Sequence, residues 1–125
     1  MSKSKNGRYV AENSALAKLS NVRVSPRKLN LVAQLIRGKN IMDAMNALKF
    51  CEKRISKDVK QLLNSAVANA ENNHNLDVDR LIVTEASVGN SMTLRRIDIK
   101  GRSRRGIIRK PYANMRLVVS EVETV

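Results

Sequence analysis

Residues 95–110, which read RRIDIKGRSRRGIIRK, restrict the possible folds of this chain more than any other segment. Eight of the sixteen positions are Arg or Lys, yet four isoleucines stand among them. So much charge excludes a strand inside a protein core, and a disordered tail would not need the isoleucines. Flanking segments rich in β-branched residues, DRLIVTEASV and PYANMRLVVSEV, both read as strands. The pattern predicts an antiparallel hairpin whose arms continue beyond a sheet.

The predicted hairpin pairs residues 81–97 with residues 102–118. At ~3.3 Å per residue each strand would extend roughly 55 Å, far beyond the ~14 Å radius of gyration of a compact domain of this length. An isolated two-stranded ribbon is marginal in water. We therefore expect a polyanion beside it, with the arginines on phosphate and the isoleucines keeping the ribbon paired and packing into gaps.

The distribution of charge indicates a neutral packing unit that carries two basic surfaces. Net charge is +13 over 125 residues, and it is concentrated in residues 1–40 (net +8) and 95–110 (net +7), whereas residues 41–78 are neutral. A hydrophobic content of 42% is enough for one modest core. We therefore predict a single domain, residues 1–125, with a flexible basic segment at 1–12 and an extended arm and tip at 89–110.

Hydrophobic periodicity predicts a short strand within residues 14–24, where Val22 and Val24 alternate with Arg23, and then three helices. In the first helix, Ser25 is the N-cap candidate, Pro26 suits the first position, and Gly38 suits the stop. The second helix, NIMDAMNALKFC, begins after a cap at Asn40, and the third covers roughly residues 52–72. The apolar stripes are Leu29, Val32, Ala33 and Ile36; Ile41, Ala44, Met45 and Leu48; and Ile55, Val59, Leu62, Leu63, Ala66, Val67 and Ala70.

Basic residues in the two charged segments are the candidates for nucleic-acid binding. Arg27 and Lys28 lie in the first turn of a predicted helix, where the helix dipole disfavours cations, so we expect them to serve a partner. With few aromatic residues available for base stacking, recognition should depend on the folded shape and the phosphate backbone of the nucleic acid. The full set of candidates is Arg23, Arg27, Lys28, Arg37, Lys39, Arg95, Arg96, Lys100, Arg102, Arg104, Arg105, Arg109 and Lys110.

No catalytic or metal-binding pattern is evident in the sequence. His74 is the only histidine and Cys51 the only cysteine, and neither has companions at ligand or nucleophile–base spacing. The segment GRSRRG lacks the Lys and Ser/Thr of a P-loop. We predict no enzyme activity, no cofactor and no metal. A lone cysteine, no signal-peptide pattern and no long apolar run indicate a cytoplasmic protein without membrane insertion.

Three segments together resemble a known family: RVSPRKLNLVAQLIRGK, LLNSAVANAENNHNLDVDRLIVTEASVG, and the hairpin with KGRSRRG. The chain is similar, from about Ala15 to Val122, to the bacterial large-subunit ribosomal protein family numbered twenty-two. The resemblance implies an α+β fold, with three helices packed on a small antiparallel sheet and a long protruding basic β-hairpin. It also implies a structural constituent of the large ribosomal subunit.

The resemblance further implies where such a protein lies in the ribosome. Its globular part would bind large-subunit ribosomal RNA near the mouth of the peptide exit tunnel, and its hairpin would line that tunnel. Neighbouring large-subunit proteins and the nascent polypeptide would be further partners, and no homo-oligomer is expected. Carried over to this chain, the tunnel-lining tip comprises Leu94, Arg95, Arg96, Ile97, Asp98, Ile99, Lys100 and Gly101.

Two other kinds of protein remain open at the level of the residues. A free-standing basic nucleic-acid binder, such as an architectural DNA protein, would also use a basic hairpin. An enzyme that acts on nucleic acid would need acid–base or metal-binding residues that the sequence does not show. Co-sedimentation with ribosomal particles at high salt separates the ribosomal protein from the architectural one.

Overall fold

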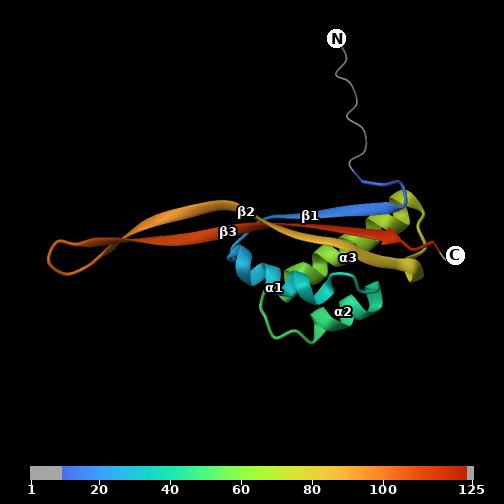
Figure 1. Ribbon diagram of the computed structural model, residues 1–125, viewed down its shortest axis with the longest axis horizontal. Helices are drawn as coiled ribbons and strands as arrows, with labels where there is room; N and C mark the ends of the chain where they lie inside the picture. The colour runs from blue at the N-terminus through green and yellow to red at the C-terminus, as the bar shows by residue number, and fades with distance from the viewer. Residues whose placement is uncertain (1–9, 124–125) are drawn as a thin grey trace, which may run out of the picture.

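Within residues 10–123, the part that the computed structural model describes, three α-helices pack on one face of a three-stranded antiparallel sheet (Figure 1). The arrangement confirms the predicted α+β fold with its protruding hairpin. The elements are β1 (Ser14–Val22), α1 (Pro26–Ile36), α2 (Ile41–Lys49), α3 (Ser56–His74), a 3₁₀ turn (Val78–Arg80), β2 (Leu81–Ile99) and β3 (Arg105–Glu121). In this described part, no helix is long and apolar enough to cross a membrane.

The strand order is β1-β3-β2, so the last strand of the sequence lies in the middle of the sheet. β3 pairs with β1 from Ser14 opposite Ser120, and with β2 from Leu81 opposite Glu121. β3 therefore has a neighbouring strand on each side. Successive side chains of a strand point to opposite faces, so alternate residues of β3, such as Leu117 and Val119, point toward the helices and are fully buried. The predicted strands were 81–97 and 102–118: β2 ends two residues later than predicted, and β3 begins and ends three residues later.

Local chemistry fixes both ends of α1. The hydroxyl of Ser25 accepts a hydrogen bond from the Lys28 amide (3.3 Å), and Pro26 opens the helix. After the helix, Gly38 adopts φ +74°, which L-residues with side chains adopt at a cost. Its amide donates to the carbonyl of Val83 (2.8 Å), and the Val83 amide donates to Lys39 (3.0 Å), which covers part of the edge of β2. The predicted cap, helix start and stop are confirmed.

The first turns of the other two helices differ from the prediction. Asn40 occupies the N-cap of α2, but its side chain makes no capping bond. α3 begins at Ser56 rather than near residue 52, because the Ser56 hydroxyl donates back to the carbonyls of Lys53 (2.6 Å) and Cys51 (3.3 Å) and closes a turn there. The helix ends at His74, two residues later than expected, where Asn75 adopts a left-handed conformation.

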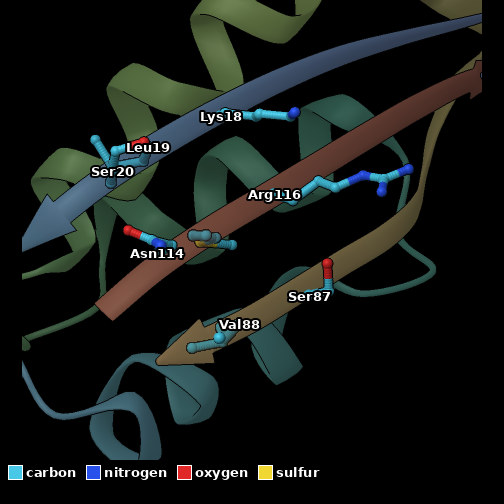
Figure 2. Close-up of a pocket in the computed structure, with 9 residues that line it drawn as sticks. Lys18, Leu19, Ser20, Ser87, Val88, Asn114 and Arg116 are labelled. Atoms are coloured by element: carbon cyan, nitrogen blue, oxygen red, sulfur yellow. The ribbon is translucent and has the colours of Figure 1, made fainter. Parts of the chain in front are cut away.

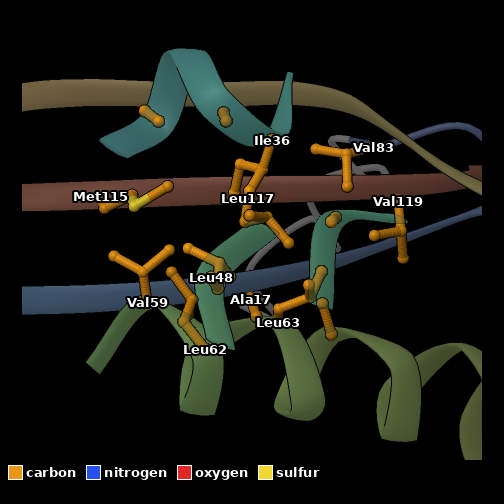
Figure 3. Packing of buried hydrophobic residues seen from close by; sticks show 14 of the residues in the cluster. Ala17, Ile36, Leu48, Val59, Leu62, Leu63, Val83, Met115, Leu117 and Val119 are labelled. Carbon is orange, nitrogen blue, oxygen red and sulfur yellow. The ribbon is translucent and has the colours of Figure 1, made fainter. Parts of the chain in front are cut away.

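One core lies between the helices and the sheet (Figure 3). Ile36 of α1, Leu63 of α3 and Leu117 of β3 have no solvent exposure, and Leu48 of α2 retains 2%. Burying a Leu or Ile side chain contributes about 1.5–3 kcal/mol, so these contacts hold the layers together. The predicted stripes are buried, except that Met45 and Val67 lie at the margin of the core.

The hairpin leaves the body where β1 ends. The last β1 residue to pair is Val22, opposite Ala113, whereas β2 and β3 stay paired as far as Ile99 opposite Arg105. From Ala113 to the turn the ribbon has only two strands and extends about 30 Å at 3.3 Å per residue. Figure 1 shows this arm pointing away from the helices. The part of the hairpin outside the sheet is therefore roughly half of each long strand.

Candidate nucleic-acid interface

The arm, defined here as residues 91–112, exposes basic and apolar side chains on both of its faces. Residues directly opposite each other in an antiparallel ladder share a face. Arg95 lies opposite Arg109 and Ile97 opposite Ile107, which places these two pairs on one face. The opposite face carries the pairs Leu94–Lys110, Arg96–Ile108 and Asp98–Gly106. Within residues 10–123, no other helix or strand covers either face of the ribbon.

The electrostatics of the arm are unfavourable in isolation. Like charges directly opposite each other destabilise a ladder, and Arg95 and Arg109 are such a pair. Asp98 is the only acidic residue between positions 95 and 110, and its carboxylate already pairs with the Lys100 ammonium (2.6 Å). The other basic residues in positions 95–110 therefore have no acidic partner within this segment.

The isoleucines of the arm bury little surface between the two strands, so they stabilise the pairing of the ribbon less than we expected. Ile97 and Ile107 oppose each other, as a pairing role requires, but they remain 66% and 65% exposed. Ile99 lies opposite Arg105 and is 85% exposed. These exposed apolar side chains between cations provide a surface for packing against another molecule. This is consistent with the expectation that the isoleucines pack into gaps of a partner.

The turn of the hairpin lies at residues 101–104. The Arg104 amide donates to the Gly101 carbonyl (3.3 Å), and both central residues, Arg102 and Ser103, have φ +57°. Two consecutive positive φ angles are typical of the type I′ turns that join twisted strands. The predicted tip, Leu94–Gly101, therefore occupies the β2 side of the arm and the entry to the turn, while the apex itself adds Arg102 and Ser103.

A polar cluster joins all three strands at the base of the arm. Asn21, with φ +55°, interrupts β1, and its backbone N–H donates to the side-chain oxygen of Asn114 on β3 (2.9 Å). The Ser91 hydroxyl on β2 donates to the side-chain oxygen of Asn21. β1 and β2 each carry an irregularity in their pairing with β3 at this level. Bulges bend strands and increase their twist, so this cluster sets the direction in which the arm leaves the sheet.

The second predicted basic group does not form one surface. Arg27 and Arg37 line one hollow beside Ser87 and Val88 of β2, whereas Arg23 and Lys28 line a different one. Arg37 is also tied to the fold, since its guanidinium donates to the Ala86 carbonyl (2.7 and 3.1 Å) and to Asn30 (2.9 Å). The side chain of Lys39 is exposed near the edge of β2.

The open face of the sheet holds a shallow basic hollow that the sequence analysis missed (Figure 2). Lys18, Arg116 and Ser87 form one row across the three strands. Arg116 lies 3.7 Å from the carboxylate of Glu85. The period-2 alternation of the strands could have placed Lys18 and Arg116 on the face away from the helices. The hollow has a volume of about 310 Å³.

Two further cations, Lys53 and Arg54, were not candidates because they belong to the neutral middle of the chain. The structure places them beside Arg23 and Lys28, at the start of α1. Lys28 and Lys53 are 25 positions apart, and no local sequence pattern links residues at that distance. Only the tertiary structure shows that these four cations lie together. All of the predicted RNA-binding residues are exposed, but the structure distributes them over an arm and separate patches of the body.

The fold and these surfaces define a class: a small α+β protein whose neutral core carries a protruding basic arm. The sequence model of the ribosomal protein L22p/L17e family matches residues 17–120. The chain belongs to this family, and it is a structural, non-enzymatic constituent of the large ribosomal subunit.

Individual relatives agree with this assignment over nearly the whole chain. The large ribosomal subunit protein uL22 of Ruegeria sp. is 55% identical over 123 residues, covering 98% of each chain. The uL22 protein of Granulibacter bethesdensis is 54% identical over 121 residues, covering 97% of this chain and 91% of the relative. That of Beijerinckia indica is 54% identical over 125 residues, covering 100% and 97%.

Proposed function

We propose that the chain binds large-subunit ribosomal RNA chiefly through its arm, and thereby anchors the body to the subunit. The observation that carries this proposal is the two-stranded ribbon itself. It extends about 30 Å past the sheet at 3.3 Å per residue, it exposes arginines on both faces, and it has one internal ion pair between residues 95 and 110. Phosphate neutralises such charge, and Arg can bind two phosphate oxygens at once.

Membership of a large-subunit family favours ribosomal RNA over DNA as the polyanion. An architectural DNA protein would present a similar hairpin, so the ribbon alone does not separate the two. In the large subunit of a cytoplasmic ribosome, RNA can surround a narrow arm on all sides. That setting matches a ribbon that carries exposed basic residues on both of its faces.

We further propose that the body lies near the mouth of the peptide exit tunnel and that the arm lines the tunnel. Residues Leu94–Gly101, together with Arg102 and Ser103 of the apex, would then face the nascent polypeptide. The arm is narrow and directed away from the helices, so its apex can reach inward while the body stays outside (Figure 1). Contacts with neighbouring large-subunit proteins would then involve the body.

Salt dependence of binding tests the RNA part of this proposal. If the arm and the basic groups of α1 neutralise about eight phosphates, log K against log salt should have a slope of roughly −6 to −7. The measurement uses full-length protein and protein-free large-subunit ribosomal RNA. A slope shallower than about −2 would show that these cations do not lie on phosphates.

Photocrosslinking tests the tunnel part. A photoreactive residue is placed at Ser103 in the apex of the arm or, as the control, at Met42, which is 71% exposed on α2. Ribosomes that carry a labelled nascent chain are then irradiated. We expect Ser103, and not Met42, to crosslink to the nascent chain inside the ribosome. Equal crosslinking from both positions, or none from Ser103 in assembled subunits, would contradict the tunnel location.

A further inference from the structure

We infer that the hollow between the start of α1 and the loop before α3 is a second RNA-binding site, separate from the arm. We call it the α1–α3 hollow. Its volume is about 560 Å³. This inference rests on the proposed function, because it takes the same ribosomal RNA as the partner. The residues that line it are Arg23, Val24, Ser25, Lys28, Leu31, Lys53, Arg54 and Ile55.

The lining combines four cations with apolar side chains and contains no acidic residue. Within residues 10–123, no carboxylate forms an ion pair with Lys28, Lys53 or Arg54. The middle of the chain is neutral in sequence, but folding brings two of its cations against two from the basic N-terminal part. The positive end of the α1 dipole, next to Ser25, strengthens the potential there.

The hollow is held in shape by the fold. The Arg54 guanidinium donates to the Arg23 carbonyl (3.3 Å), which connects the loop before α3 to the segment before α1. The Ser56 hydroxyl closes the same loop onto the carbonyl of Lys53 (2.6 Å), and the neighbouring Ile55 is buried in the core. A site built in this way loses little conformational freedom on binding, whereas the arm must be ordered.

The chemistry of the hollow fits an unpaired stretch of RNA backbone. The ammonium groups of Lys28 and Lys53 and the guanidinium of Arg54 can contact successive phosphates. Leu31 is 49% exposed within the hollow and offers an apolar surface to a ribose or base. Unpaired RNA segments can adapt to a concave surface and present their sugars and bases, which a regular duplex does not.

Two double variants with equal loss of charge test the site. Lys28→Gln with Lys53→Gln removes two rim cations whose side chains make no hydrogen bond to another residue in the described part of the chain. Lys57→Gln with Lys60→Gln removes two cations of α3 that do not line the hollow. We measure the affinity of each full-length protein for protein-free large-subunit ribosomal RNA over a series of salt concentrations.

The rim variant should lose at least tenfold in affinity, since each charge-assisted contact is worth roughly that much. Its salt slope should become shallower by about 1.5, the value for two phosphates. The control variant should change its affinity by less than threefold. Equal losses in the two variants would overturn the site, because they would reflect overall charge.

An arm variant, with Arg102, Arg104 and Arg105 all changed to Gln, separates this inference from the proposed function. If the arm variant loses affinity and the rim variant does not, the hollow is not an RNA site but the proposed function stands. If neither variant loses affinity, both are wrong. If the rim variant binds bare RNA normally but enters large subunits poorly, the hollow binds an acidic protein instead, which also overturns the inference.

Discussion

Single basic residues of this protein have different roles, although the sequence makes them look alike. Arg37 donates hydrogen bonds to Ala86 and Asn30 and connects α1 to β2. Arg27, ten positions earlier on the same segment, is exposed and has no such bonds in the described structure. The first arginine is therefore part of the fold, and the second is available to a partner.

Alanine substitutions should separate these two roles. Arg37→Ala should lower the free energy of unfolding by about 1.5 kcal/mol, since it removes charged hydrogen bonds to a backbone carbonyl. Arg27→Ala should leave stability unchanged or raise it by a few tenths of a kcal/mol, because a cation in the first turn opposes the helix dipole. Urea unfolding of both variants measures the difference. Equal destabilisation would show that the Arg37 bonds do not matter.

Gly38 gives a second test at the residue scale. Its φ of +74° costs an L-residue roughly 1–2 kcal/mol, so Gly38→Ala should destabilise the protein by that amount. Gly89→Ala is the matched control, because a Cβ there meets no atom within 4 Å and its φ is not in the left-handed region. The two variants are compared by urea unfolding. If Gly38→Ala is as stable as Gly89→Ala, the backbone that follows α1 can rearrange to avoid the strained conformation.

Among the elements, the arm and the sheet differ in what holds them together. In the sheet, β3 has partners on both sides and a buried face, whereas in the arm it has β2 alone. Pro111 lies just past the end of β1, where a missing amide costs no bond to a third strand. An exposed two-stranded ribbon with opposed arginines is marginally stable in water.

Amide hydrogen exchange of the free protein should therefore divide β3 into two parts. We expect the amides of residues 114–119 to exchange slowly, and those of residues 105–110 to exchange much faster. Bound RNA should slow exchange in the arm selectively. Protection of Arg105 in the free protein that equals that of Leu117 would contradict this account. The predicted flexible segment, residues 1–12, lies mostly outside the described residues.

The elements also show how far the sequence predicts this structure. α1 was predicted closely because Ser25, Pro26 and Gly38 act on adjacent backbone groups. The start of α3 was placed too early because a backward hydrogen bond from Ser56 leaves no cap pattern in the sequence. Alternation within strands could have indicated the open face of the sheet. The α1–α3 hollow could not be predicted from the sequence, because Lys28 and Lys53 come to line the same hollow only when the helices pack together.

At the scale of the whole molecule, folding and binding are assigned to different regions. The neutral middle of the chain supplies two helices and nine of the 22 buried residues of the core. The positive charge lies on the arm and on exposed patches of the body, where it opposes compaction until an anion is present. The central claim is that the arm anchors the protein to ribosomal RNA.

Competitive incorporation into large subunits tests that claim most directly. A variant with Arg102, Arg104 and Arg105 changed to Glu is expressed beside the wild type, and mass spectrometry counts both in purified subunits. A control variant changes Lys49, Lys57 and Lys60 of the body to Glu, with the same change in charge. The arm variant should be depleted more than tenfold, and the control should incorporate like the wild type. Incorporation of the arm variant at the level of the control would contradict the claim.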